Sequence, residues 1–182
     1  MEKEAEVQSL TDILAKFTAY IGKRLPTDVK DKQAELRAKE TNPMAIEIFD
    51  VMAANQDAAD KLDRPSCQDT GVIQYFIQAG SSFPLLGELE SILEGATIGA
   101  TEIGPLRHNA VEAFVEKNTG TNTGSKIPWL DWEILPGKDH VIIDVYMAGG
   151  GCTLPGASTV LMPGQGYEGV AEFVLDIMTS RG

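Results

Sequence analysis

Residues 64–71, Arg-Pro-Ser-Cys-Gln-Asp-Thr-Gly, interrupt the apolar pattern of the chain and separate two periodicities. Before them, apolar residues recur at helical spacing as far as Leu62. After them, 72–78 is a run of β-forming residues that predicts a strand. This change of period predicts an α+β fold, with an N-terminal helical segment over 1–66 and an α/β part over 67–182.

Three helices are expected in the N-terminal segment. The first contains apolar residues from Val7 to Ile21 and ends near Gly22. The second begins at Pro26-Thr27-Asp28 and continues to about Lys39. Asn42 and Pro43 are suited to the cap and first turn of the third helix. Its residues expected to face the core are Ala45, Ile48, Phe49, Met52, Ala59 and Leu62.

The α/β part is expected to form a small mixed sheet with packed helices. Strands are predicted over 72–78, 129–135, 141–147 and 159–162, and helices over 85–100 and 167–180. The five residues 136–140, Pro-Gly-Lys-Asp-His, indicate a hairpin between the second and third strands. The final helix is expected to face the core with Val170, Phe173, Val174 and Ile177. The long irregular span 104–128 indicates a functional or mobile segment.

The net charge of −12 disfavours nucleic acid and anionic membranes as partners, so an anionic substrate would need a local arginine. The sequence shows neither a membrane-spanning apolar run nor a signal peptide, which predicts a cytoplasmic protein. Cys67 and Cys152 form no Cys-x-x-Cys pair, and His108 and His140 lack zinc-finger spacing. We therefore expect reduced thiols and no zinc site.

Candidate chemistry concentrates in a few short stretches. Cys67 and Asp69 lie in the turn at 64–71, although the residues alone also fit a small buried thiol and a turn-forming carboxylate. Three glycines, 149–151, indicate either a close approach to the main chain or positive φ angles. The segment Gly-Ser-Lys at 124–126 lacks the order and the preceding strand of a phosphate-binding loop.

Three stretches taken together resemble a known family. They are Cys-Gln-Asp-Thr-Gly at 67–71, Leu-Arg-His-Asn-Ala at 106–110 followed by Asn-Thr-Gly at 118–120, and the glycines at 149–151. In this order they resemble the α subunit of the iron–sulfur hydro-lyases, the family of class I fumarase and tartrate dehydratase. The resemblance covers essentially the whole chain. Residues 83–89, 128–129 and 147–156, including Cys152, are similar to the tartrate dehydratase branch.

The resemblance implies a 4Fe-4S cluster held by three cysteines, of which Cys67 matches the first. The other two positions are not found, so we expect the N-terminal part of a longer α subunit, unable alone to hold a cluster or react. By resemblance and by chemistry, Asp69 is the candidate catalytic residue, placed to contact the departing hydroxyl. The candidate substrate-binding residues are Gln68, Arg107, Gly149, Gly150 and Gly151.

The implied reaction is dehydration of L(+)-tartrate to oxaloacetate, with interconversion of fumarate and malate as the alternative. A partner β subunit is expected to supply the base that takes the carbon-bound proton, in an α2β2 assembly. A non-catalytic assembly module is the hypothesis from another class. His108 is either a base or structural, Asn109 and Asn118 could simply form turns, and Cys152 is either buried or a redox-sensitive neighbour of the site.

Overall fold

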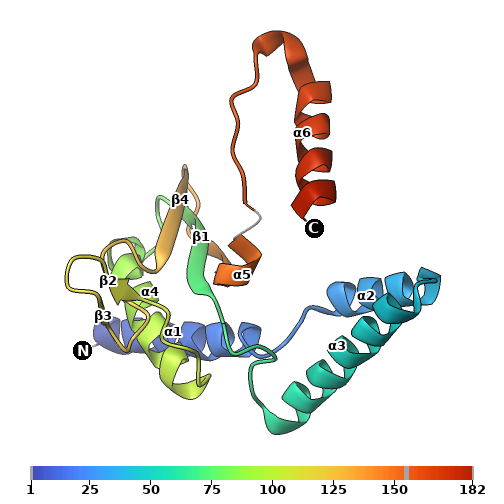
Figure 1. Ribbon diagram of the computed structural model, residues 1–182. Helices are drawn as coiled ribbons and strands as arrows, with labels where there is room; N and C mark the ends of the chain where they lie inside the picture. Colours follow the sequence, from blue (N-terminus) through green and yellow to red (C-terminus); the bar gives the residue numbers. More distant parts are fainter. Residues whose placement is uncertain (1, 154–155, 182) are drawn as a thin grey trace. The chain divides into compact units, whose positions relative to one another are not determined.

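The computed structural model describes residues 2–153 and 156–181. The chain forms two compact units, one ending at Met147 and the other beginning at Ala148. The first contains the N-terminal helices, most of the sheet and the packed helix, and the second contains the C-terminal helix (Figure 1).

The three N-terminal helices are confirmed: α1 is Glu2–Ile21, α2 is Thr27–Lys39 and α3 is Pro43–Leu62. The side chain of Asn42 accepts a hydrogen bond from the Met44 amide at 2.9 Å, and Pro43 occupies the first turn. This cap satisfies an amide that has no partner inside the helix, and proline has no amide to satisfy. The beginning of α3 is therefore fixed by its local sequence.

The sheet contains β1 (Val72–Gly80), β4 (Trp129–Leu135) and β5 (Val141–Ala148) in the order β4-β1-β5. The predicted α+β class is confirmed, but the predicted hairpin of 129–135 with 141–147 is wrong, because β1 lies between these strands. β1 pairs parallel with β4, and the Gly80 amide donates to the His140 carbonyl oxygen at 2.8 Å. A Cβ on Gly80 would lie 2.2 Å from the Lys138 carbonyl oxygen, so the connection from β4 to β5 crosses the end of β1 tightly.

One face of the sheet forms the core with α4 (Leu89–Ile103), which follows the short helix η1 (Leu86–Glu88), and with α1. Alternate residues of β1 are buried, as expected for a strand packed on one face. The Tyr75 hydroxyl lies 3.1 Å from Thr18 Oγ1 and 3.3 Å from Thr97 Oγ1, which ties β1 to both helices. The buried apolar residues of the two helices are Leu14, Ala15, Ala19, Leu89, Ile92, Leu93, Ala96 and Ala100.

The core faces predicted for α3 and for the last helix are largely wrong. On α3, Ile48, Met52 and Leu62 are 55%, 45% and 71% exposed, and only Ala59 of the predicted set is buried. In the second unit, α6 (Gly166–Arg181) leaves Val170 and Val174 about half exposed, at 46% and 48%. Helical periodicity reveals an apolar face, but it does not identify what covers that face.

The remaining segments also differ from the predictions. The span 104–128 contains two short antiparallel strands, β2 (Val111–Glu112) and β3 (Lys117–Asn118). The predicted strand at 159–162 is absent from the described backbone there, which continues as coil into the short helix η2 (Pro163–Gln165). A short helix α5 occupies Gly150–Thr153. Among the described residues, no helix is both long and apolar enough to cross a membrane.

Candidate functional site

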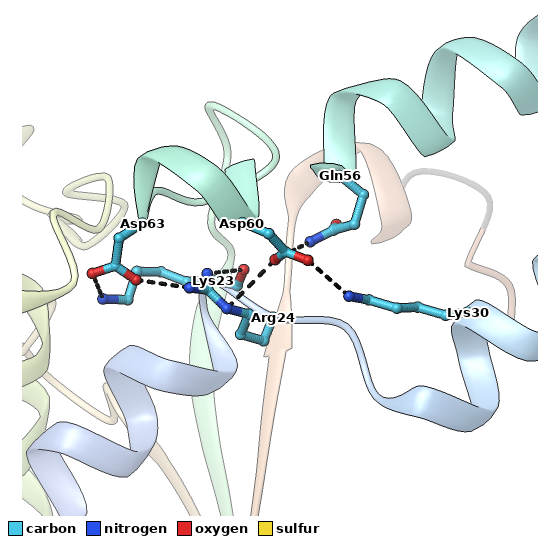
Figure 2. Close-up of polar contacts among 6 residues, drawn as sticks. All are labelled: Lys23, Arg24, Lys30, Gln56, Asp60 and Asp63. Atoms are coloured by element: carbon cyan, nitrogen blue, oxygen red, sulfur yellow. Dashed lines mark hydrogen bonds and ion pairs between the residues drawn. The ribbon is translucent and has the colours of Figure 1, made fainter. Parts of the chain in front are cut away.

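The segment that carries Cys67 begins where α3 ends. Asp63 closes α3 in the left-handed conformation, with φ of 51°, and its backbone amide donates to the Ala59 carbonyl oxygen. Its carboxylate accepts hydrogen bonds from Lys23 Nζ at 2.8 Å and from Arg24 Nη2 at 2.9 Å (Figure 2). The end of α3 is therefore attached to the segment that follows α1.

A second set of charges reinforces this junction. Asp60 accepts hydrogen bonds from Lys30 Nζ at 2.9 Å and from Gln56 Nε2 at 3.1 Å, and Arg24 Nε lies 3.4 Å away (Figure 2). The hydrogen bond from Lys30 holds the pKa of Asp60 below its ordinary value, and the one from Lys23 does the same for Asp63. These contacts connect α1, α2 and α3 immediately before the Cys67 segment.

Two hydrogen bonds and one positive φ angle shape the segment 64–71. Asn55 Nδ2 on α3 donates to the Ser66 carbonyl oxygen at 2.7 Å. Asp69 Oδ1 accepts from the Gly71 amide at 3.1 Å, the pattern of an Asx turn. Gly71 has φ of 86°, a conformation in which a side chain is strained, so glycine is required here. The turn predicted from the sequence is thus formed by Asp69 itself.

Cys67 and Gln68 are exposed on this turn, and Asp69 is half-buried. The alternative in which Cys67 is a small buried hydrophobic residue is therefore wrong. An exposed thiol is accessible to a metal or a reactant. The turn-forming role of Asp69 is confirmed, and it fixes one carboxylate oxygen two residues from the thiol.

Asn109 joins this turn to the segment that carries Arg107. Its side-chain Nδ2 donates to Asp69 Oδ1 at 2.9 Å and to the Gly71 carbonyl oxygen at 3.0 Å. The Arg107 amide donates to Thr70 Oγ1 at 3.0 Å. The two motifs that the sequence singled out are therefore in direct contact, although many residues separate them along the chain. The Arg107 side chain itself is exposed.

Asn122 is the residue of this site that sequence reasoning missed. It is 4% exposed and has a positive φ of 56°, which asparagine tolerates better than most residues. Its Oδ1 accepts from the Asn109 amide at 2.6 Å, and its Nδ2 donates to the Arg107 carbonyl oxygen at 2.9 Å. The available signal was one asparagine in a Thr- and Gly-rich stretch, which is typical of any surface turn.

The other candidates are less well defined by their surroundings. His108 is exposed, and its carbonyl oxygen accepts a hydrogen bond from Asn118 Nδ2. Asn118 Oδ1 accepts from the Gly120 amide at 2.8 Å, which confirms its turn-forming role. His140 is exposed beside Asp139, with its Nδ1 3.7 Å from that carboxylate.

The glycines 149–151 belong to the second unit, whereas Cys67, Asp69 and Arg107 belong to the first. At Gly151 the φ angle lies outside the left-handed region, and a Cβ would meet no atom within 4 Å. The fold of the described residues therefore imposes no glycine at this position, and close approach by a bound molecule stays a prediction. The side chain of Cys152 lies outside the part that the structure describes, so both of its predicted roles stay open.

The described residues of this site do not by themselves fit a cluster held by three cysteines. In the part of the chain that the structure describes, no three His, Cys, Asp or Glu residues gather as a metal site would require. Cys67 offers one exposed thiol, which is a suitable single ligand for iron. What the geometry brings together is a thiol, a half-buried carboxylate and a segment carrying a guanidinium.

Comparisons with known proteins add an independent observation. The sequence model of the family described as fumarate hydratase, or fumerase, matches residues 11–182. The L(+)-tartrate dehydratase subunit alpha of Escherichia coli strain K12 is 56% identical over 174 residues, covering 96% of this chain and 57% of that protein. The protein of the same name from Shigella boydii has the same identity and coverage.

A more distant relative gives the same indication. The putative L(+)-tartrate dehydratase subunit alpha of Methanocaldococcus jannaschii is 30% identical, over 95% of this chain and 62% of that protein. The chain thus spans somewhat more than half the length of these relatives, while the match covers nearly all of the chain itself.

Proposed function

The chain belongs to the fumarate hydratase family, and from this premise we propose that it is part of a hydro-lyase that dehydrates L(+)-tartrate to oxaloacetate. The observation that carries the proposal is the contact between two motifs. The Asp69 carboxylate is hydrogen-bonded to Asn109 at 2.9 Å, and the Arg107 amide to Thr70 at 3.0 Å, beside the exposed Cys67 thiol. The names of the relatives supply the substrate.

The reaction breaks a C–O bond on one carbon of tartrate and a C–H bond on its neighbour, and the resulting enol becomes the ketone. Tartrate carries two carboxylates, which a protein of net charge −12 would repel without a local cation. The exposed guanidinium of Arg107 provides a planar pair of donors for one carboxylate. Gln68, exposed on the neighbouring turn, orients the substrate through its amide.

Asp69 is the candidate catalytic residue. A half-buried carboxylate held by two N–H donors keeps a fixed orientation; it can accept a hydrogen bond from the departing hydroxyl or, once protonated, pass that proton to it. The glycines 149–151 are proposed to meet the substrate with their backbone amides. The base that removes the carbon-bound proton is proposed to come from a β subunit, in an α2β2 assembly in the cytoplasm.

Cys67 is proposed as one of three cysteine ligands of a 4Fe-4S cluster, with the other two supplied by protein outside these 182 residues. Such a cluster supplies a Lewis acid for the leaving hydroxyl. The Cys67 thiol is exposed, as expected for a ligand that shares a metal site with residues from outside this segment. On this proposal the 182 residues alone bind no intact cluster and have no turnover.

Two alternatives compete with this proposal. The description of the matching family favours interconversion of fumarate and malate, which uses the same removal of water beside a carboxylate. The second alternative, from another class, is that the 182 residues are a non-catalytic assembly module when isolated. These alternatives predict turnover of malate and no turnover at all, respectively.

The decisive experiment is an anaerobic assay of the complete α and β pair with tartrate and with malate. We expect oxaloacetate from tartrate, and turnover of malate alone would eliminate the preferred substrate. Cys67→Ser should abolish turnover and iron content. Retention of metal and rate by Cys67→Ser would contradict the assignment of the thiol.

A further inference from the structure

Asn109 and Asn122 link the two motifs through a closed set of hydrogen bonds. Asn109 Nδ2 donates to Asp69 Oδ1, and the Asn109 amide donates to Asn122 Oδ1 at 2.6 Å. Asn122 Nδ2 donates to the Arg107 carbonyl oxygen at 2.9 Å, and the Arg107 amide donates to Thr70 Oγ1 at 3.0 Å. The set begins and ends in the turn that carries the candidate catalytic carboxylate.

The Asn122 side chain makes every hydrogen bond that an amide group can make. Its Oδ1 accepts from the amides of Asn109 and Ala110, at 2.6 and 3.4 Å. Its Nδ2 donates to the Arg107 carbonyl oxygen and to Thr101 Oγ1, at 2.9 and 3.1 Å. This buried side-chain amide accepts two hydrogen bonds and donates two, so its hydrogen-bonding capacity is fully used. Through Thr101 the set is attached to the core helix α4.

Arg107 is held in an unusual way for a residue with an exposed side chain. Both polar groups of its backbone are bonded to side chains: the amide to Thr70 and the carbonyl oxygen to Asn122. Neither bond belongs to a helix or a strand. The backbone of Arg107 is therefore fixed relative to the turn at 67–71, while its exposed guanidinium is accessible to a ligand.

We propose that Asn109 and Asn122 are positioning residues that set the separation between the Asp69 carboxylate and the Arg107 guanidinium. This inference rests on the proposed function, in which both groups contact one small dicarboxylate. Asn109 acts through Asp69, because its side chain bonds that carboxylate. Asn122 acts through Arg107 and through the backbone of Asn109, because it bonds both.

The expected effects follow from this division. A displacement of about 1 Å in a reacting group can cost on the order of 100-fold in rate. Asn109→Ala should lower kcat by about 10- to 100-fold and leave the KM for tartrate within roughly threefold. Asn122→Ala should raise the KM for tartrate by about fivefold or more and also lower kcat, because the backbone of Arg107 loses its hydrogen bond to Asn122.

The test uses the complete enzyme and the controls that the chain offers. Asn109→Ala keeps the backbone bond to Asn122, so its fold should be retained, and circular dichroism checks this. Asn42→Ala is the matched control, because this exposed asparagine caps α3 through the Met44 amide and belongs to none of the hydrogen bonds of the closed set. It should keep kcat and KM within roughly twofold of the wild type.

A double-mutant cycle separates positioning from general structural support. Asp69→Asn keeps the acceptor oxygen of the turn but removes the carboxylate. If Asn109 acts through Asp69, adding Asn109→Ala to Asp69→Asn should change kcat by no more than about twofold. If the loss of kcat in the double variant equals the product of the losses in the two single variants, Asn109 acts independently of Asp69. Its role would then be merely structural, and the inference would be overturned.

The outcomes distinguish this inference from the proposed function. Loss of activity in Asp69→Asn with normal kcat and KM in a folded Asn109→Ala would overturn the positioning role alone. Full activity of Asp69→Asn would overturn the assignment of the carboxylate, and the inference with it. No turnover of tartrate or malate by the wild-type enzyme would overturn the proposed function and everything that rests on it.

Discussion

The core formed by α1, β1 and α4 and the helical arm formed by α2 and α3 each contain an amphipathic helix, α4 in the core and α3 in the arm, and these two helices have different surroundings. On α4, Ile92 is 1% exposed, whereas on α3 Ile48 is 55% exposed. The core is held by packed apolar side chains around Tyr75, and the arm is attached through Asp60 and Asp63 to cations before and within α2 (Figure 2). An apolar stripe therefore predicts a helix but not its burial.

The arm is also loosely packed within itself. A pocket of about 280 Å³, partly open to solvent, lies between α2 and α3, with Ala34, Phe49 and Met52 among its lining residues. The bidentate pair of Arg37 with Asp50, at 2.7 and 2.9 Å, lies at the same place. A helix pair joined by surface ion pairs gains little stability from each of them. We expect the arm to tolerate substitutions that the core does not.

The largest difference between core and arm should come from two matched isoleucine substitutions. Ile92→Ala on α4 should lower the free energy of unfolding by about 3 kcal/mol, since it leaves a cavity in a packed core. Ile48→Ala on α3 should change it by less than about 0.5 kcal/mol. Urea unfolding followed by circular dichroism measures both. Equal losses would show that the arm is as tightly packed as the core.

A smaller effect should come from the buried hydroxyl of Tyr75. Tyr75→Phe removes the group that lies between Thr18 and Thr97, so the free energy of unfolding should fall by about 1 kcal/mol. The exposed Tyr20, at 59%, gives the matched control Tyr20→Phe, which should have no measurable effect. An unchanged unfolding curve for Tyr75→Phe would mean that these hydrogen bonds contribute nothing to the free energy of unfolding beyond the packing of the ring.

The elements that the sequence predicted well are those with local signals. Asn42 and Pro43 determine the beginning of α3, and Pro26 precedes the first residue of α2, Thr27. These signals act within one helical turn, so they can be read without the fold. What covers a helix depends on distant residues, which explains why Ile48 was wrongly assigned to the core.

The strand predictions failed where pairing is non-local. The runs 129–135 and 141–147 are strands, but β1 lies between them, and a short connecting segment does not reveal that. The β-forming run at 159–162 has no partner strand among the described residues and remains coil. Strand propensity describes a fit to a neighbouring strand, and the neighbour comes from elsewhere in the chain.

The site shows the same division between local and distant information. The residues that carry recognisable chemistry, Cys67, Asp69 and Arg107, could be named from their motifs. Asn122 could not, because its burial and its four hydrogen bonds exist only once the 118–124 segment lies against Thr101 of α4. A single asparagine in a polar turn has the same sequence pattern whether it is exposed or central.

A third prediction tests whether the arm is coupled to the candidate site. Asn55 on α3 bonds the Ser66 carbonyl oxygen, immediately before Cys67. Asn55→Ala should cost about 0.5 kcal/mol in the free energy of unfolding and speed hydrogen exchange at the amides of 67–68. Unchanged exchange at these amides would show that the site depends on the Asn109 side of the turn and not on the arm.

The smallest expected effect concerns acid. The pKa values of Asp60 and Asp63 are held below their ordinary value by hydrogen bonds from Lys30 and Lys23. Carboxylates with lowered pKa stabilise the fold above their ordinary pKa, about 4, and this contribution disappears as the pH falls through the lowered pKa. Below about pH 4, hydrogen exchange should therefore increase at the end of α3 before it increases in α4.

A control variant separates this junction from general acid unfolding. Asp63→Asn removes the charge that Lys23 and Arg24 share, so at neutral pH it should already increase exchange at the end of α3. Asp50→Asn removes the partner of Arg37 elsewhere on the same helix and should leave that region unchanged. Simultaneous loss of protection in α3 and α4 on acidification would mean that arm and core unfold as one unit, contrary to the difference in their packing.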